Sequence, residues 1–187
     1  MTSTPDDASL VDEVLAGSPS AFSVLVKRYT DRLYRVVFAV VGEGAAAEDV
    51  LQETFLRAYA GLASFSRRSQ FRTWLYRIAL NEAYRARRSV SRQRERPFSQ
   101  LGGDALRPLL EERAAPASPG DESRRHVLEL LDGLPREYRE AMLLRHVDGL
   151  SYVEIAEVLG TTAGTVGSWL HRAREVLRER VHDRGTD

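Results

Sequence analysis

Residues 64–96 constrain the fold most, because their apolar side chains follow the spacing of an α-helix while their polar side chains carry a concentrated charge. Phe71, Leu75 and Ile78 follow one another at steps of four and three, the pattern of a helix that packs one stripe against a core. The same segment holds ten Arg and two Glu, a local net charge of +8, whereas the formal net charge of the whole chain is zero. This segregation predicts a helix with one buried face and one strongly basic face.

A second stripe on the predicted helix mixes aromatic, cationic and amide side chains. Its members follow at steps of three and four residues and are Trp74, Arg77, Asn81, Tyr84 and Arg88. Such a face suits single-stranded nucleic acid, because rings stack on unpaired bases at about 1 to 3 kcal/mol per base while guanidiniums meet phosphates. The alternative is that Trp74 and Tyr84 are half-buried packing and that the arginines form a solvated face. Arg makes up 26 of the 27 Lys and Arg residues of the chain, so the use of Arg by itself says nothing about this segment. Only the clustering of Arg within residues 64–96 is informative.

A polar loop over residues 61–70 precedes this helix and carries Phe65 between two serines, followed by Arg67 and Arg68. A loop of this composition offers a ring and cations to an extruded base, whose unstacking must be offset by stacking and phosphate contacts. An ordinary connection in which Phe65 tucks into the core is the simpler interpretation. The loop composition alone favours it.

The rest of the composition excludes several classes of protein. The chain contains no Cys, which excludes disulfide frameworks, zinc ribbons and thiol nucleophiles. Residues 1–7 have neither a basic region nor an apolar core, which argues against a signal peptide. No apolar run approaches the ~20 residues that a membrane span needs, so we expect a cytoplasmic protein without membrane insertion. Helical periodicity with few strand-like alternations predicts an all-α fold.

Three helices are expected ahead of the basic segment, over residues 9–16, 18–41 and 45–62. The third places Phe55 on its apolar side and gathers acidic and amide groups on its polar side, namely Glu48, Asp49, Gln52 and Glu53. Metal ligation is one interpretation of this polar side, but such sites usually draw on several elements and often on a His. None of the four His residues lies in this half. A solvated acidic face and a docking surface for a basic partner are the other interpretations.

Residues 93–120 interrupt the helical pattern with Pro, Gly and Ser, a composition that argues against a packed core and predicts a flexible linker. We therefore expect two small helical domains, over residues 1–92 and 121–187. A short helix over residues 106–113 is compatible with the pattern inside the linker.

The second domain carries the sharpest local signal of the chain. Ser151 and Glu154 form a capping box that opens a short helix, and Gly160 ends it. Thr161 or Thr162 then caps a second helix, whose side chains expected to point outward are Thr165, Ser168, Trp169 and Arg172. Two helices joined by such a tight turn predict a helix-turn-helix, whose second helix typically enters the major groove.

A purely structural helical hairpin is the alternative for this pair, and net charge does not decide between the two. Residues 121–187 hold ten Arg and thirteen acidic residues, a net charge of −3. Attraction to phosphates must therefore be local, through Arg172, Arg174 and Arg178, with Arg136 and Arg139 as further candidates.

An acidic helix, an aromatic and basic helix, a linker and a C-terminal helix-turn-helix, in this order, resemble a bacterial sigma factor of the sigma-70 family. The resemblance is to the extracytoplasmic-function (ECF) group, which retains only the second and fourth sigma regions. It rests on residues 47–55 (AEDVLQETF), residues 71–75 (FRTWL) with Asn81, and residues 149–174. It covers nearly the whole chain outside the linker and the tails.

The resemblance implies a partner for each of the three surfaces. The second-region domain would bind the core of bacterial RNA polymerase through Glu48, Asp49, Gln52, Glu53 and Phe55. The melted minus-10 strand of promoter DNA would be captured by Phe65, Arg67, Arg68, Trp74, Arg77, Asn81, Tyr84 and Arg88. The minus-35 element would be read as duplex by Arg136, Thr162, Thr165, Ser168, Trp169, Arg172 and Arg174. An anti-sigma factor is a further implied partner, and no cofactor, metal or catalytic residue is implied.

Three residues depart from the family pattern. Family members commonly carry Lys and Arg where this chain has Gly167 and Trp169, which would remove two phosphate or base contacts at the minus-35 element. Arg85 stands where many members carry an Asp, at the edge of the implied minus-10 pocket.

Two other classes of function remain as alternatives. A helix-turn-helix repressor or activator would bind duplex operators as a dimer without polymerase. An enzyme would need a catalytic constellation, and His146, Asp148 and Ser151 lie close enough in sequence to suggest a triad. A helix end and a helix cap explain these three residues better. We therefore expect a binding protein rather than an enzyme.

Overall fold

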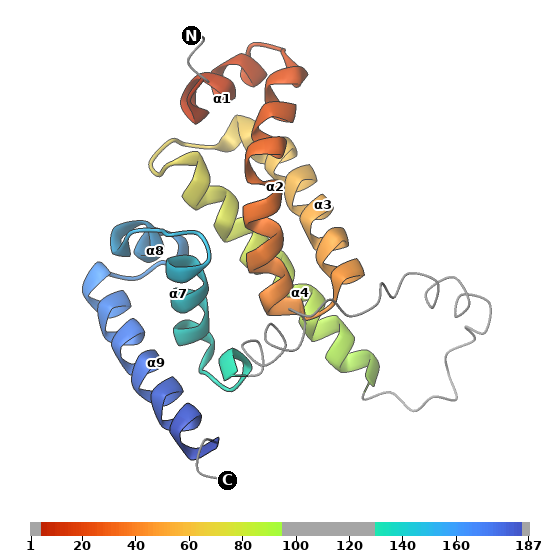
Figure 1. The fold of residues 1–187 in the computed structure, drawn as a ribbon. Coiled ribbons are helices and arrows are strands. Elements are labelled where there is room, and N and C mark those ends of the chain that lie inside the picture. Colours follow the sequence, from red (N-terminus) through yellow and green to blue (C-terminus); the bar gives the residue numbers. More distant parts are fainter. Residues whose placement is uncertain (1–4, 95–129, 185–187) are drawn as a thin grey trace, which may run out of the picture.

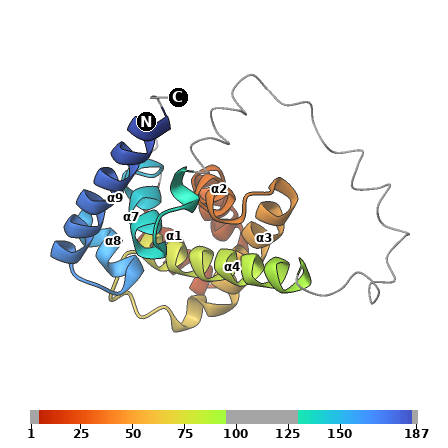
Figure 2. The same ribbon diagram turned by 90° about the horizontal axis from the view of Figure 1, so that it is seen from below.

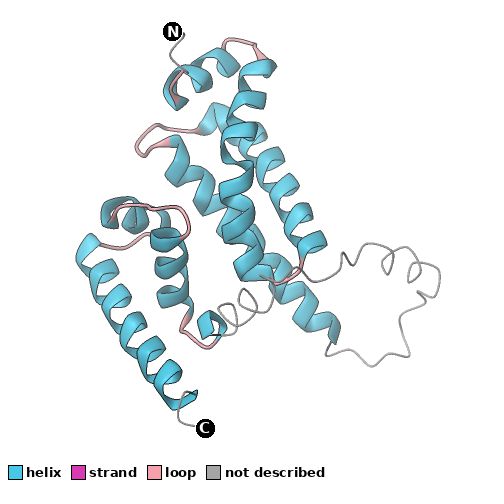
Figure 3. Cartoon of the chain, in the orientation of Figure 1, coloured by secondary structure: helices cyan, strands magenta, loops and turns pink. Residues whose placement is uncertain are grey.

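The computed structural model describes residues 5–94 and 130–184, and all of its regular elements in these ranges are helices (Figure 1, Figure 3). The prediction of an all-α fold is confirmed. The N-terminal unit consists of α1 (Asp7–Leu15), α2 (Pro19–Val41), α3 (Gly44–Gly61), a 3-10 turn (Leu62–Ser64) and α4 (Phe71–Arg94). The C-terminal unit consists of α7 (Arg136–His146), α8 (Tyr152–Leu159) and α9 (Ala163–Arg184). The part of the chain that the structure describes contains no helix long and apolar enough to cross a membrane.

The helix boundaries of the N-terminal unit follow from local side-chain chemistry. The Asp6 carboxylate accepts a hydrogen bond from the backbone N–H of Ser9 at 2.8 Å and caps α1. Pro19 occupies the first turn of α2, where its missing N–H leaves no hydrogen bond unmade. Gly42 ends α2 with a φ of 82°, a left-handed conformation that favours glycine.

The core of the N-terminal unit lies between α2, α3 and α4, and α1 lies across one end of this bundle (Figure 1). Leu25, Leu33, Leu75 and Ala79 are fully buried there. The stripe predicted from Phe71, Leu75 and Ile78 does face the core, although Ile78 is only partly buried.

The C-terminal unit is the predicted helix-turn-helix, with α7 packed behind it. Ser151 and Glu154 form the capping box: the Glu154 N–H donates to the Ser151 hydroxyl at 3.3 Å, and the Ser151 N–H donates to the Glu154 carboxylate at 2.8 Å. Gly160 makes the turn with a φ of 68°. Val166 and Leu170 are fully buried between α9 and the rest of the unit.

The two units pack against each other, which the periodicity of the sequence does not reveal. Helix α8 lies against α4, and α7 lies near α2 (Figure 1, Figure 2). Most of the predicted linker and the predicted short helix over residues 106–113 lie outside the described residues. Helix α4 itself extends to Arg94 and so includes the first two residues of the predicted linker.

Candidate polymerase and nucleic-acid interfaces

The acidic side of α3 faces solvent. Glu48, Asp49 and Gln52 are exposed, and Glu53 is half-exposed and pairs with Arg57 one turn later, at 2.6 Å. Within residues 5–94 and 130–184, no group of three or more His, Asp or Glu side chains is placed to hold a metal ion. The face is therefore an acidic surface, available for contact with a basic partner.

Phe55 lies on the apolar side of α3, as predicted, and not on this exposed face. Its side chain is only 9% exposed and meets the Phe22 ring edge-on, with 6.5 Å between centroids. It forms part of the floor of a surface pocket of about 470 Å³ between α2 and α3. Leu56 and Tyr59 stand at the rim with 59% and 47% of their surfaces exposed. Apolar side chains left open beside Glu48 and Gln52 are typical of a protein-binding surface.

The start of α4 is occupied by an aromatic cluster. The Trp74 ring lies 5.0 Å from the Phe65 ring and 5.8 Å from the Phe71 ring, centroid to centroid. The indole also closes over Gly61, where an added Cβ would lie 3.4 Å from the ring. Phe65 and Trp74 are each half-buried. Phe65 is therefore tucked against the core, as the loop composition favoured, while both side chains keep part of their surface exposed.

The two arginines of the loop behave differently. Arg67 adopts a left-handed backbone with a φ of 56° and forms an ion pair with Asp12 of α1. The hydrogen bond from Arg67 lowers the pKa of the Asp12 carboxyl below its ordinary value. Arg68 is exposed and projects from the loop surface. A pocket of about 640 Å³ lies beside the loop, between α1 and α4, with Tyr29 and Phe65 in its wall.

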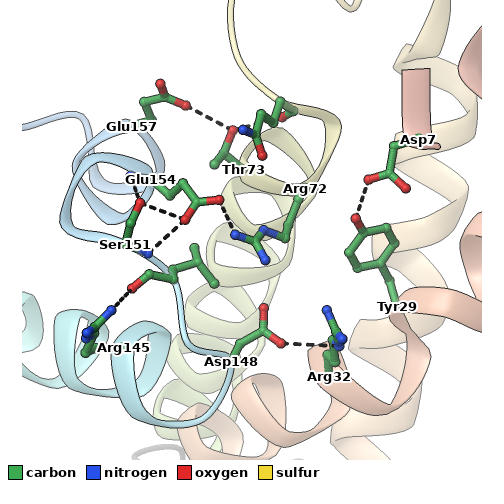
Figure 4. Close-up of polar contacts among 12 residues, drawn as sticks. Asp7, Tyr29, Arg32, Arg72, Thr73, Arg145, Asp148, Ser151, Glu154 and Glu157 are labelled. Carbon is green, nitrogen blue, oxygen red and sulfur yellow. Dashed lines mark hydrogen bonds and ion pairs between the residues drawn. The ribbon is translucent and has the colours of Figure 1, made fainter. Parts of the chain in front are cut away.

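Tyr29 in that wall donates a hydrogen bond to the Asp7 carboxylate, which also accepts one from Arg28 (Figure 4). Burial, followed by this hydrogen bond, raises the pKa of the Tyr29 hydroxyl far above its ordinary value. Tyr29 is thus a fixed, neutral donor that holds α1 against the bundle.

Further along α4, exposed polar residues line an open pocket of about 650 Å³. Asn81, Arg85 and Arg88 contribute to it from α4, and Arg57 contributes from α3. Glu82, only 7% exposed, forms an ion pair with Arg57 at 3.1 Å and accepts a hydrogen bond from Arg85 at 3.2 Å. Arg85, one of the departures from the family pattern, is therefore held in place and adds a cation to the pocket. Sequence reasoning missed Arg57 and Glu82, because they join the site only through the packing of α3 on α4.

The predicted stripe on α4 meets the C-terminal unit, and two of its members contact that unit: Arg77, which stays exposed, and Tyr84, which is buried. Arg77 donates through Nε to the Val158 carbonyl at 3.3 Å and through a second nitrogen to the Glu157 carbonyl. Tyr84 is 8% exposed and lies beneath the Arg136 guanidinium, which is 4.0 Å from the ring centroid. Burial raises the pKa of Tyr84 to about 12. A helical wheel predicts the side of α4 on which these residues lie. It does not predict which other helices contact that side.

At the start of the predicted recognition helix, three hydroxyl groups make local hydrogen bonds. Thr162 caps α9 by accepting from the Thr165 N–H at 3.2 Å, and the two hydroxyls lie 2.9 Å apart. The Ser168 hydroxyl donates to the Gly164 carbonyl at 3.2 Å. Arg172 and Arg174 are exposed. These side chains lie along one helix, where a duplex could reach them.

Two members of the minus-35 set are placed differently from the expectation. Trp169 is half-buried against the core of the unit instead of pointing outward, because its large ring gains more from packing than from exposure. Arg136 lies on α7, where it covers Tyr84 and pairs with Glu140 at 2.8 Å, so it faces the N-terminal unit. Gly167 leaves space that the Tyr152 ring fills, since an added Cβ would lie 3.7 Å from that ring.

His146, Asp148 and Ser151 have separate structural roles. Ser151 bonds to Glu154 within the capping box, with 2.7 Å between the hydroxyl and the carboxylate. The Asp148 carboxylate pairs with Arg32 of α2 at 3.7 Å. His146 lies in the last turn of α7, and partial burial, followed by the charges of Arg174 and Arg145, lowers its pKa. The interpretation as a helix end and a cap accounts for these residues.

Sequence families match the two units separately. The family described as "Sigma-70 region 2" matches residues 25–93, and the one described as "Sigma-70, region 4" matches residues 124–177. The ECF RNA polymerase sigma-E factor of Escherichia coli (strain K12) is 38% identical, over 94% of this chain and 94% of that protein. The RNA polymerase sigma-H factor of Pseudomonas aeruginosa is 36% identical, over 95% of this chain and 94% of that protein. The ECF RNA polymerase sigma factor SigW of Bacillus subtilis is 32% identical, over 92% and 95%.

Two solved structures share the fold over both units. CnrH, determined in complex with the cytosolic domain of CnrY, matches with a TM-score of 0.74 and 25% identity, over 95% of this chain and 97% of that chain. The sigma factor RpoE of Bartonella quintana, determined with the anti-sigma factor NepR, matches with a TM-score of 0.66 and 26% identity, over 86% and 96%. The sequence matches and the shared fold together establish that this chain belongs to the sigma-70 family, in its ECF group of RNA polymerase sigma factors.

Proposed function

We propose that this protein is a cytoplasmic sigma factor that binds core RNA polymerase and directs promoter recognition, minus-10 melting and transcription initiation, with no catalytic chemistry of its own. The observation that carries this proposal is the pairing, on one chain, of a basic and aromatic helix with a helix-turn-helix. One surface suits single-stranded DNA and the other suits duplex DNA. An initiation factor has to recognise both.

The surface proposed for core binding combines the acidic side of α3 with the apolar pocket beside it. Asp49 and Gln52 supply exposed polar groups, and Leu56 and Tyr59 supply exposed apolar surface around the Phe55 floor. An interface built this way gains affinity from its apolar centre and specificity from its charged rim. Its partner would be a basic and amphipathic element of the polymerase.

The surface proposed for the melted minus-10 strand runs along α4. Trp74 and Phe65 each offer one side of a ring, and Arg68 stands next to them. The pocket lined by Asn81, Arg85 and Arg88 follows along the helix and suits a phosphate or a base edge. Arg77 is exposed on this surface, whereas the buried Tyr84 would join it only after the C-terminal unit moves away.

The surface proposed for the minus-35 element is the outer side of α9. Arg172 and Arg174 are exposed there and would meet phosphates or base edges, while Thr165 and Ser168 carry hydroxyl groups at the same end. Thr162 and Trp169 would act indirectly, the first as a cap and the second as packing. Gly167 presents only backbone, so we expect shape and backbone contacts to dominate at that position.

Control by a separate anti-sigma protein is part of the proposal. CnrH was solved with the cytosolic domain of CnrY, and the Bartonella quintana protein with an anti-sigma factor. Both structures match this chain over most of its length. This supports an anti-sigma partner for the present chain, one that would compete with polymerase for the two units.

The deciding experiment is transcription of a fragmented genomic library by purified protein mixed with bacterial core polymerase, with start sites mapped against core alone. New starts that share two spaced upstream motifs are the expected result. Binding of the free protein to palindromic duplex, with no new starts, would instead identify a dimeric repressor or activator. Hydrolytic or nucleotide-dependent turnover that disappears in a point variant would contradict the absence of catalysis.

A further inference from the structure

The pocket between α3 and α4 is lined by hydrogen-bonding groups that mostly donate. Arg57 of α3 and Arg85 and Arg88 of α4 contribute guanidinium groups, which are donors only. The carboxylate in the lining belongs to Glu82, which is buried and already pairs with Arg57 and Arg85. Asn81 adds an amide group, which both donates and accepts. A ligand of this space, which we call the α3–α4 pocket, must therefore supply acceptors.

Glu82 fixes Arg85 in an orientation that keeps most of its donors available to a ligand. Their hydrogen bond uses one terminal nitrogen of Arg85, Nη1, which donates to the Glu82 carboxylate at 3.2 Å. The Arg85 side chain is nevertheless 60% exposed, and its other N–H groups lie in the same planar fork. A buried carboxylate is costly without cations, so Glu82 keeps both Arg57 and Arg85 close. The Arg85 fork is therefore ordered before a ligand arrives, which lowers the entropic cost of binding.

The α3–α4 pocket also has an apolar side, which favours a flat ring over a bare phosphate group. The half-buried Ile78 and the exposed Ala60 belong to its lining. The Trp74 indole packs against Gly61, which lines the same pocket. Its volume of about 650 Å³ lies within the range of small-molecule sites. A nucleobase would cover the apolar side chains and turn its polar edge to the guanidiniums, whereas a phosphate would use the guanidiniums alone.

Of the four bases, guanine fits a lining of donors best. Its O6 and N7 atoms are neighbouring acceptors on one edge, which an Arg fork binds with two hydrogen bonds. Adenine and thymine each present only one acceptor on the corresponding edge, beside an amino donor in adenine and beside a methyl group in thymine. Cytosine has neighbouring acceptors only at O2 and N3, where the attached sugar crowds O2 and the amino donor adjoins N3.

We infer that Arg85 determines specificity in the α3–α4 pocket and selects a guanine at one position of the melted minus-10 strand. The inference rests on the proposed function, because it names the base that one part of the proposed minus-10 surface takes. Arg85 donates to O6 and N7, and the ring lies against Ile78 and Ala60. A bidentate pair of this kind favours the correct base by about 5- to 150-fold.

The first measurement is initiation by the holoenzyme on a promoter found by start-site mapping, with each minus-10 position randomised in turn. We expect the parent to prefer guanine at one position of the non-template strand. Arg85→Gln should reduce that preference at least about fivefold, because an amide no longer offers two donors to O6 and N7. Preferences at the other positions should stay. The control is Arg35→Gln, which makes the same change at an exposed position of α2 and should keep the guanine preference.

The second measurement replaces that guanine with base analogues in the non-template strand. The analogue 7-deazaguanine lacks the N7 acceptor, whereas hypoxanthine keeps O6 and N7 and lacks the 2-amino group. We expect 7-deazaguanine to lower initiation by the parent at least about fivefold and hypoxanthine to change it little. Arg85→Gln should use guanine and 7-deazaguanine equally well, because it has lost the group that binds N7.

Three results would overturn the inference. The first is a parent that prefers cytosine, or no base, at every minus-10 position. The second is equal use of guanine and 7-deazaguanine by the parent. The third is an Arg85→Gln variant that loses initiation uniformly and keeps the guanine preference, since Arg85 would then contact a phosphate.

A measurement without polymerase separates this inference from the proposed function. The free protein is titrated with fluorescein-labelled strands of about 20 thymidines that carry one central guanine or one central 7-deazaguanine. We expect tighter binding of the guanine strand by the parent and by Arg35→Gln, and equal binding of the two strands by Arg85→Gln. Equal binding by the parent would contradict guanine selection. A guanine preference in a protein that gives no new start sites would refute the proposed function and leave the base selection standing.

Discussion

At the scale of single residues, the rings on α4 show how one side chain can serve both packing and recognition. Trp74 packs against Phe65, Phe71 and Gly61 and still keeps part of its ring exposed. Tyr84 lies on the same helix but is buried under Arg136. The two aromatic residues of the predicted stripe therefore need different substitutions. Trp74 is tested for a role in DNA opening, and Tyr84 is tested for its contribution to stability.

Trp74→Ala should impair opening of promoter DNA while leaving the affinity for core polymerase largely unchanged, because the indole is placed to stack on an unpaired base. Removing a half-buried indole should also lower the free energy of unfolding, by about 1 to 3 kcal/mol. Permanganate reactivity of promoter thymines would report opening, and thermal unfolding would report stability. Loss of core affinity in the folded variant would contradict a role in strand capture.

Tyr84→Phe should leave the stability of the protein nearly unchanged. The Tyr84 hydroxyl is buried and has no hydrogen-bond partner among the described residues, so its removal leaves no other group unsatisfied. We expect a change of at most about 1 kcal/mol in the free energy of unfolding, measured by urea denaturation. A markedly larger loss would mean that the hydroxyl makes a hydrogen bond that the structure does not show.

At the scale of elements, α3 and the helix-turn-helix carry the proposed binding roles. Their boundaries could be predicted, because caps and left-handed turns are local. Ser151, Glu154 and Gly160 mark α8 in the sequence and perform the expected roles in the structure. Side-chain orientation within an element was less predictable. Trp169 was expected to point outward, but it is half-buried against the core because a large ring gains from packing.

Asp49→Arg should weaken the binding of core polymerase without reducing helix content. Asp49 is exposed on α3, so the substitution reverses a surface charge and disturbs no packing. The measurement is a titration of labelled core polymerase, with circular dichroism as the check on folding. Glu13→Arg makes the same change at an exposed position of α1 and serves as the control. Equal core affinities for the two variants would remove α3 from the proposed interface.

The pH dependence of stability should reveal the ion pair and the cap of Glu154. Partial burial acts to raise its pKa, but hydrogen bonds from Ser151 and Arg72 prevail, and the pKa of Glu154 is lowered. A lowered pKa in the folded state means that the carboxylate stabilises the fold above its ordinary pKa, about 4.3. This stabilisation is lost as the pH falls through the lower, folded-state pKa.

Glu154→Gln mimics the protonated carboxyl, so the two proteins should differ most near neutral pH. We expect the difference between their melting temperatures to shrink progressively below about pH 4, as Glu154 of the parent protein becomes protonated. Thermal unfolding over a series of pH values makes the comparison. If the difference between the two melting temperatures stays constant down to the pH at which the protein unfolds, the charge of Glu154 contributes nothing to stability.

At the scale of the whole molecule, the sequence predicted two helical units but not their contact. Arg77 and Tyr84 were visible as members of a basic and aromatic stripe, and Glu154 was visible as part of a capping box. Their meeting depends on residues some 80 positions apart in the chain, such as Arg72 and Glu154. Local periodicity holds no information about such pairs. The long-range arrangement therefore had to come from the structure.

The double use of the Glu154 carboxylate has a consequence for genetics. In a selection for bacteria in which the contact between the two units is weakened, substitutions at Arg32 or Asp148 should be recovered, because they remove an ion pair and leave the helix caps in place. At position 154, Gln would keep the hydrogen bond that the Ser151 N–H donates, whereas Ala or Lys would lose it together with the ion pair. Gln should therefore be recovered more often than Ala or Lys at this position, although all three release Arg72.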